Sequence, residues 1–568
     1  MHKLRENIAP ATGAYHQLQP QTKRKPFIAT IAQLALALVG FATASFIVLH
    51  FALVASPTAL PFLLPIDPIV TADWDSLKNS LDSLRKEWLV PGMAVAVVHQ
   101  GELVFTHASG LRNENDAVTT DTLFQIGSTT KAFTSFSVAQ LVDAGVLNWE
   151  TPLTSQYPVE FMDTTANATA NLIDALSHRT GLPRHDFIML NGATSEENLS
   201  RIKYLQPSAP FREKFQYNNH MVNLAGTIGG KVSGLGWDQL VHKSILKPLG
   251  MDNTFTDPYD IFSREDHSRG HGIMPDGSGS LFMFEYNETL WIDSTKPAGA
   301  ILSSVNDLAK WVALINNKGV NPADGKRFVS EKQFSTIFTK HTPGAQLMPV
   351  TGGVIKDVSY GLGWFMESYR GKACVEHGGN TVGYSTQITT FPEDSLAIIV
   401  LTNLNGTPLP EIAAQYISDV LLFPRSWSYW STLWKSYLLK AYAQSLIERR
   451  RIVNSRNKDS VPSLPLAAYV GTYHNAGYGD FQIRLRTVET FDAVLVGHPG
   501  HTSVLELVLG HWEYDTFGVF EMRLQRYRDY TFPLIQLHFH LADQGGAVES
   551  LSAKLESSVD NIVFKRVD

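Results

Sequence analysis

The run Phe124-Gln-Ile-Gly-Ser-Thr-Thr-Lys-Ala-Phe133 is the most informative part of this chain. It places a hydroxyl, Ser128, and an amine, Lys131, three residues apart at the start of a predicted amphipathic helix. Apolar residues recur at helical spacing up to Gly145, where the helix is expected to end. Residues three apart share a helix face, so the Lys131 amine can lie beside the Ser128 hydroxyl and activate it as a nucleophile.

A Ser-x-x-Lys pattern is weak by itself. Any single match is better explained as an exposed serine and lysine on a helix surface. The same spacing recurs at four other places, which begin at Ser83, Ser200, Ser244 and Ser455. Two later clusters distinguish the pattern at Ser128 from these.

The first cluster is Phe215-Gln-Tyr-Asn-Asn-His220, in which Tyr217 and Asn219 stand two apart before a small-residue helix pattern. The second is Glu376-His-Gly-Gly-Asn380, which leads into the strand-like segment 383–391. Its paired glycines would let a substrate backbone approach the strand closely.

The order Ser-x-x-Lys, Tyr-x-Asn, His-Gly-Gly resembles the serine β-lactamase and penicillin-binding-protein superfamily. The chain is most similar to its class C β-lactamase-like branch of esterases and peptidases, from about residue 75 to about residue 422. The resemblance implies an α+β fold, with an antiparallel sheet packed against a helical block. Apolar segments in hairpin arrangement at both ends of this region agree with that expectation.

The resemblance also implies catalytic roles. Ser128 would be the acylated nucleophile, and Lys131 and Tyr217 would share the proton transfers. Asn219 would hold Lys131 in place and bind the substrate. The backbone N–H groups of Ser128 and Asn380 would form the oxyanion hole.

His377 occupies the position where many β-lactamases have a lysine. A histidine is largely uncharged at neutral pH, so a preference for carboxylate-bearing lactams is not expected. Gly378 and Gly379 would leave space for substrate beside the oxyanion hole.

Composition excludes several classes of function. With 44% hydrophobic and 18% charged residues the 568-residue chain is globular, and its net charge of −7 argues against a nucleic-acid partner. Cys374 is the only cysteine, so no intramolecular disulfide and no cysteine-based metal site can form. We expect no metal and no cofactor, and a small-molecule or peptide substrate.

Residues 27–54 predict a transmembrane signal anchor. The run would span about 42 Å as a helix, more than the ~30 Å hydrocarbon core of a bilayer. The basic tail 1–26 ends near Lys23-Arg-Lys25, so it would be cytoplasmic and the catalytic part lumenal or extracellular. A cleaved signal peptide is the alternative. Four possible N-glycosylation sites fit the same placement, at Asn167, Asn198, Asn287 and Asn405.

The remaining sequence divides into three parts. Residues 72–424 would form the β-lactamase-like catalytic domain, and 425–460 an aromatic helical linker. Residues 461–568 alternate apolar and polar positions, which favours a small antiparallel β-barrel. Similar enzymes often carry a lipocalin-like domain at this place, and this barrel is expected to shape the cleft without supplying the chemistry.

The leading functional hypothesis is a serine hydrolase that cleaves an ester or amide through an acyl-Ser128 intermediate. An acyltransferase would use the same acylation step, and the sequence does not separate the two. A non-catalytic binding protein of the same fold is a third reading, which the intact motif residues disfavour.

Overall fold

The computed structural model describes Ile69 and residues 72–568, with gaps at 275–277, 286–287, 289, 346–352, 424–428, 489–490, 501–504, 525–526, 530–534 and 544–545. The predicted basic tail and the predicted anchor lie outside the described residues. In the part that is described, no helix combines the length and the apolar character needed to cross a membrane.

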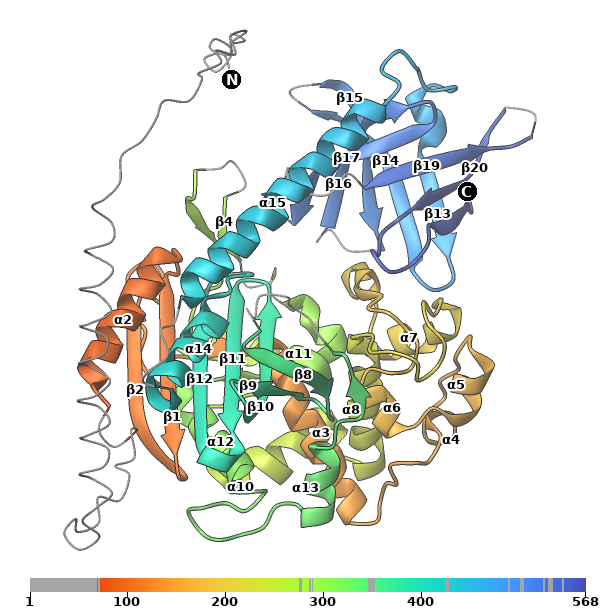
Figure 1. The fold of residues 1–568 in the computed structure, drawn as a ribbon. Helices are drawn as coiled ribbons and strands as arrows, with labels where there is room; N and C mark the ends of the chain where they lie inside the picture. The colour runs from red at the N-terminus through yellow and green to blue at the C-terminus, as the bar shows by residue number, and fades with distance from the viewer. Residues whose placement is uncertain are drawn as a thin grey trace, which may run out of the picture. The chain divides into compact units, whose positions relative to one another are not determined.

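An antiparallel sheet forms the centre of the catalytic domain (Figure 1). Its strand order is β2-β1-β12-β11-β10-β9-β8-β7, so β1 from the start of the domain pairs with β12 from its end. The strands are β1 (Gly92–His99), β2 (Glu102–Gly110), β7 (Thr342–Pro343), β8 (Ile355–Tyr360), β9 (Phe365–Tyr369), β10 (Lys372–Thr381), β11 (Tyr384–Phe391) and β12 (Leu396–Thr402). The predicted α+β architecture, with a hairpin at either end of the domain, is confirmed.

Helices cover both faces of this sheet. One face meets α2 (Trp74–Glu87) and α14 (Leu409–Leu422), and the other meets α12 (Val305–Asn316) and the helical block. Successive strand residues point to opposite faces. In β1, therefore, Ala94, Ala96 and Val98 belong to one core, whereas Met93, Val95 and Val97 belong to the other. Burial on both faces explains why β1 and β12 are apolar almost throughout.

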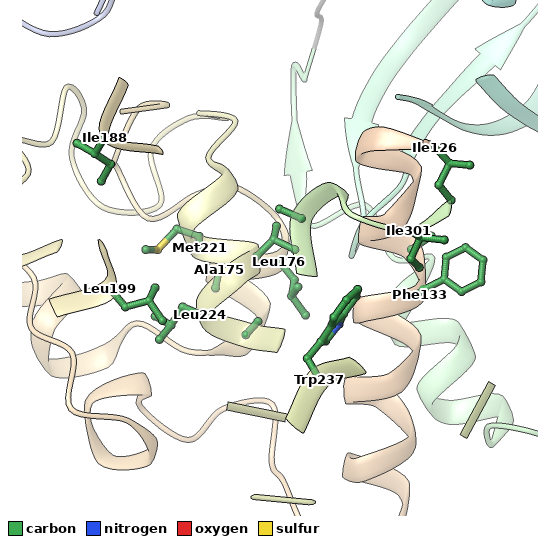
Figure 2. Packing of buried hydrophobic residues seen from close by; sticks show 14 of the residues in the cluster. Ile126, Phe133, Ala175, Leu176, Ile188, Leu199, Met221, Leu224, Trp237 and Ile301 are labelled. Carbon is green, nitrogen blue, oxygen red and sulfur yellow. The ribbon is translucent and has the colours of Figure 1, made fainter. Parts of the chain in front are cut away.

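The helical block is built around α3 (Thr130–Asp143) and α8 (Asn219–Ser233). Phe133 on α3 stacks on Trp311 with ring centroids 4.1 Å apart. Trp237 lies beside the helix that carries Phe133 (Figure 2), and its indole N–H donates to Thr134 Oγ1 at 2.9 Å. Gly226 lets α8 approach Pro297 on α11 (Lys296–Gly299) closely, since a Cβ at Gly226 would lie 2.4 Å from the proline ring. These contacts fix α3 and α8, the two helices at whose starts the first two motifs lie.

A long helix, α15 (Trp430–Ser455), follows the catalytic domain. Its first turns pack against α14, and Trp430 and Trp434 are buried there. The buried Asp419 carboxylate accepts hydrogen bonds from the Trp430 indole N–H and from the Arg370 guanidinium on the loop after β9. The start of α15 is thereby attached to the catalytic domain.

The C-terminal domain is a closed antiparallel barrel. Its described strands are β13 (Gly471–Asn475), β14 (Gly479–Val488), β15 (Phe491–Pro499), β16 (Leu505–Glu513), β17 (Thr516–Leu524), β19 (Gln536–Leu541), β20 (Val548–Ala553) and β21 (Ile562–Arg566), with β18 (Tyr527–Asp529) beside β17. Pairing of β16 with β17 closes the ring of eight strands. Tyr469, Phe517 and Phe539 pack edge to face inside it. The predicted small β-barrel is confirmed.

Candidate active site

Ser128 lies in a tight 3₁₀ turn, Gly127–Thr129, that leads directly into α3. Gly127 has a positive φ of 55°, a conformation that favours glycine. A Cβ on Gly127 would also lie 2.9 Å from the backbone nitrogen of Asn380 on β10. The turn and β10 are therefore in close backbone contact beside the nucleophile.

Lys131 is fully buried on the first turn of α3. Its Nζ lies 3.0 Å from Ser128 Oγ and donates to the Ala298 carbonyl oxygen at 2.7 Å. Burial, reinforced by the positive charge of Arg184, holds the pKa of Lys131 well below its usual range. The lowered pKa favours the neutral amine, whose lone pair can take the Ser128 proton as a general base requires.

Tyr217 closes the other side of Ser128. The Lys131 Nζ lies 4.9 Å from its ring centroid, and the Tyr217 hydroxyl hydrogen-bonds with Ser128. Burial raises the pKa of Tyr217 although the Arg184 charge opposes this shift. The phenol therefore keeps its proton and can donate it.

His178 forms the wall behind Tyr217, with ring centroids 4.4 Å apart. Its Nδ1 accepts the Asn218 backbone N–H at 3.1 Å, so the proton of the neutral ring is on Nε2. Burial lowers the pKa of His178 well below its ordinary value. His178 is thus a neutral positioning group for the tyrosine.

The hydrogen bond of the Asn219 amide goes to Asp186 and not to the Lys131 amine, which the resemblance implied as its partner. Its Nδ2 donates to Asp186 Oδ1 at 3.0 Å, while the Lys131 amine is held by Ser128 and Ala298. Asp186 also accepts from Arg184 Nε at 3.0 Å, and the Arg184 guanidinium lies 4.8 Å from the centroid of the Tyr217 ring. The amide is therefore part of an ion-pair network, and its contact with substrate stays a prediction.

The third motif lies on β10, next to the nucleophile turn. A Cβ on Gly379 would lie 1.9 Å from the Ile126 carbonyl oxygen, so only glycine allows this approach. The contact places the Asn380 backbone beside Ser128. The N–H groups of Ser128 and Asn380 are the pair expected to form the oxyanion hole.

His377 lies on the face of β10 toward Tyr217 and is 2% exposed. Its Nδ1 donates to the Gly378 carbonyl oxygen at 2.7 Å, and its Nε2 accepts from Tyr360 Oη at 2.9 Å. Burial lowers the pKa of His377 to about 3. His377 is therefore neutral throughout the physiological range.

A cavity of about 360 Å³ contains these groups. Ser128, Tyr217, His377, Gly378 and Asn380 line one part of it, and glutamates from β9, β10 and α14 line another. Throughout the described residues, no three His, Cys, Asp or Glu side chains are grouped so that they could hold a metal ion. The arrangement brings Ser128, Lys131 and Tyr217 into mutual contact, which suits acyl transfer through a serine nucleophile.

A model of the beta-lactamase family matches residues 78–422, and a model described as a domain of unknown function (DUF3471) matches residues 455–566. The chain belongs to the beta-lactamase family. With Ser128 and Lys131 in contact, family and site support a serine-hydrolase type of activity.

Two relatives illustrate the range of this family. An unguisins hydrolase of Aspergillus violaceofuscus is 29% identical over 432 residues, which cover 70% of this chain and 74% of that protein. Penicillin-binding protein 4 of Amycolatopsis lactamdurans is 26% identical over 346 residues, 59% of this chain and 86% of that protein.

Solved structures agree on the fold. The octameric penicillin-binding protein homologue from Pyrococcus abyssi covers 87% of this chain and 100% of its own, with a TM-score of 0.53 at 21% identity. A D-amino acid amidase from Ochrobactrum anthropi covers 62% of this chain and 100% of its own, with a TM-score of 0.51 at 20% identity.

The sequence did not reveal Arg184, Asp186 or Tyr360 as site residues. Arg184 and Asp186 lie in a loop, where charged residues carry no specific signal. Tyr360 ends β8, and only the pairing of β8 with β9 and of β9 with β10 brings it to His377.

The barrel holds the loop that carries Arg184 and Asp186. Tyr478 Oη donates to His185 Nδ1 at 2.7 Å, because the His185 Nε2 proton is donated to the Gln206 carbonyl oxygen. Glu556 Oε1 accepts the Phe187 backbone N–H at 2.7 Å. The C-terminal domain thus contacts the active-site loop without contributing a reacting group.

We expect Tyr478→Phe to slow acylation of Ser128 by about five-fold, because one buried hydrogen bond of about 1 kcal/mol no longer holds the loop. The rate of labelling by a fluorophosphonate measures this. Tyr469→Phe is the matched control, since Tyr469 is a buried barrel tyrosine that donates to Asp515 away from the loop. Equal labelling rates for both variants would show that the barrel does not support the site.

Proposed function

We propose that this protein is a serine hydrolase that cleaves an ester or an amide of a small molecule or peptide through an acyl-Ser128 intermediate. The observation that carries the proposal is the 3.0 Å contact between Ser128 Oγ and a fully buried Lys131 amine. The name of the relative with 29% identity, a hydrolase, favours water as the final acceptor.

The acylation step follows from the neutral forms of the Lys131 amine and the Tyr217 phenol. Lys131 takes the proton of Ser128 as Oγ attacks the substrate carbonyl carbon. The N–H groups of Ser128 and Asn380 stabilise the resulting oxyanion. Tyr217 gives its proton to the leaving alcohol or amine and receives one from the Lys131 ammonium, so both groups regain their starting forms.

Deacylation repeats these transfers with water in place of the leaving group. An acyltransferase would admit an alcohol at this step, and acylation of Ser128 would be the same. The neutral His377 offers no positive charge to a substrate carboxylate, which favours esters and amides that lack a carboxylate over penicillins.

We further propose that residues 27–54 anchor the protein, with the catalytic part lumenal or extracellular. The long apolar run after a basic tail supports this. The full-length protein should then stay in membranes washed with carbonate and dissolve in detergent, and protease added to sealed vesicles should spare the catalytic domain. Release of a soluble form that begins after the apolar run would indicate a cleaved signal peptide.

Ser128→Ala is expected to abolish fluorophosphonate labelling and turnover of esters, amides and penicillin alike, because the nucleophilic oxygen is lost. Lys131→Ala should reduce turnover by at least about 100-fold, as expected for loss of a general base. Ser83→Ala removes the serine of another Ser-x-x-Lys match, on α2, and should change neither readout. Turnover by folded Ser128→Ala protein would contradict the mechanism.

The pH dependence should report the state of Lys131. Its pKa lies well below the usual lysine value, so kcat/KM for an uncharged ester should reach its plateau well below the roughly pH 10 at which an ordinary lysine loses its proton. Activity should fall as the pH falls through that lowered pKa, because Lys131 then gains a proton and cannot act as base. An activity that instead rises only above roughly pH 9 would indicate an ordinary lysine pKa.

A further inference from the structure

Three glutamates line the cavity that contains Ser128. Glu367 lies on β9, Glu376 on β10 and Glu411 on α14. On the sheet, Glu367 pairs with Cys374 and Glu376 with Phe365, so both glutamates lie on one face. That face is covered by α14, from which Glu411 approaches. The acylation mechanism uses none of these carboxyl groups.

The path from the nucleophile to these carboxyl groups runs along β10. Glu376, Gly378 and Asn380 alternate onto the same face of the strand. Gly378 contributes no side chain between the other two, and a Cβ there would lie 2.9 Å from Gln387 Oε1. The Cα atoms of Glu376 and Asn380 are about 13 Å apart along the strand.

Among the described residues, no Lys, Arg or His side chain pairs with the three carboxyl groups. Gln387 Nε2 donates to Glu376 Oε2 at 2.6 Å, and Gln415 Nε2 donates to Glu411 Oε1 at 3.1 Å. Glu367 is 7% exposed, and among the described residues it has neither a hydrogen-bond donor nor an ion-pair partner. An unpartnered, buried acceptor therefore faces the substrate cavity.

In its charged form such an arrangement is unfavourable unless protons or a bound cation neutralise it. Burial raises the pKa of all three groups, and the negative charge of Glu376 raises those of Glu367 and Glu411 further. The three groups are not arranged as metal ligands within the described part of the chain. The cavity of about 360 Å³ has room for an organic cation with several N–H donors.

We propose that Glu367, Glu376 and Glu411 form a subsite for a cationic group of the substrate, an ammonium or a guanidinium, at the end of a chain roughly six carbons long. This proposal rests on the proposed acylation of Ser128. It makes the enzyme selective for basic esters or amides. The cation can belong to the acyl group or to the leaving group, and matched substrates distinguish the two.

The first experiment compares two pairs of substrates with the wild-type enzyme. One pair is an aminohexanoyl and a hexanoyl ester of the same alcohol, and the other is the acetyl esters of aminohexanol and hexanol. If the cation belongs to the acyl group, kcat/KM should be at least about ten-fold higher for the aminohexanoyl ester than for the hexanoyl ester. If it belongs to the leaving group, the same difference should separate the two acetyl esters, as expected for hydrogen bonds to charged groups. Equal values within both pairs would overturn the proposal.

The second experiment measures the same cationic-to-neutral ratio in variants. Glu367→Gln should lower the ratio at least about five-fold, because the charge is lost while the shape is kept. Glu376→Gln and Glu411→Gln provide the same test if the first variant does not fold. The matched control is Glu288→Gln, at a buried glutamate outside the cavity lining. An unchanged ratio in the folded subsite variants would contradict the proposal.

The third experiment separates the subsite from the proposed catalysis. Calorimetry with Ser128→Ala protein should detect binding of hexylammonium but not of hexanol. Hexylammonium binding together with an unreactive wild-type Ser128 would support the subsite and refute the acyl-enzyme mechanism. Labelled Ser128 and turnover of neutral esters, without hexylammonium binding, would refute the subsite alone.

Discussion

The backbone contact between β10 and the turn at Ser128 is the constraint on which the site depends. Gly379 lies against the Ile126 carbonyl, and Gly127 lies against the Asn380 nitrogen. A side chain at either glycine would collide with main-chain atoms, which cannot move aside as a flexible side chain can. The contact joins the sheet to the helical block at the place where the nucleophile and the oxyanion donors must meet.

Around that contact the reacting groups are buried and uncharged. Lys131, Tyr217, His178 and His377 all have pKa values shifted toward their neutral forms, with burial as the largest cause. In such surroundings, fixed N–H donors stabilise a developing oxyanion more strongly than they would in water. Desolvation therefore creates the base, preserves the acid and strengthens the oxyanion hole.

The barrel takes part in the site although it carries none of the three motifs. Tyr478 and Glu556 hold the loop whose Arg184 lies over Tyr217 and whose Asp186 accepts from Asn219. Arg184 is also among the charges that act on Lys131. A domain far along the chain thus influences the electrostatics of the nucleophile through a single loop.

The sequence by itself determined what depends on local geometry. Helical spacing brings Lys131 to Ser128, and apolar alternation predicts the hairpins and the barrel, because these follow from backbone periodicity. The pairing of Asn219 with Asp186, the full burial of Lys131, and the gathering of Glu367, Glu376 and Glu411 could not be predicted. These contacts and this burial depend on which distant segments pack around each side chain and exclude water from it. Only the tertiary structure decides that, since desolvation is a property of the assembled surroundings and not of the residue.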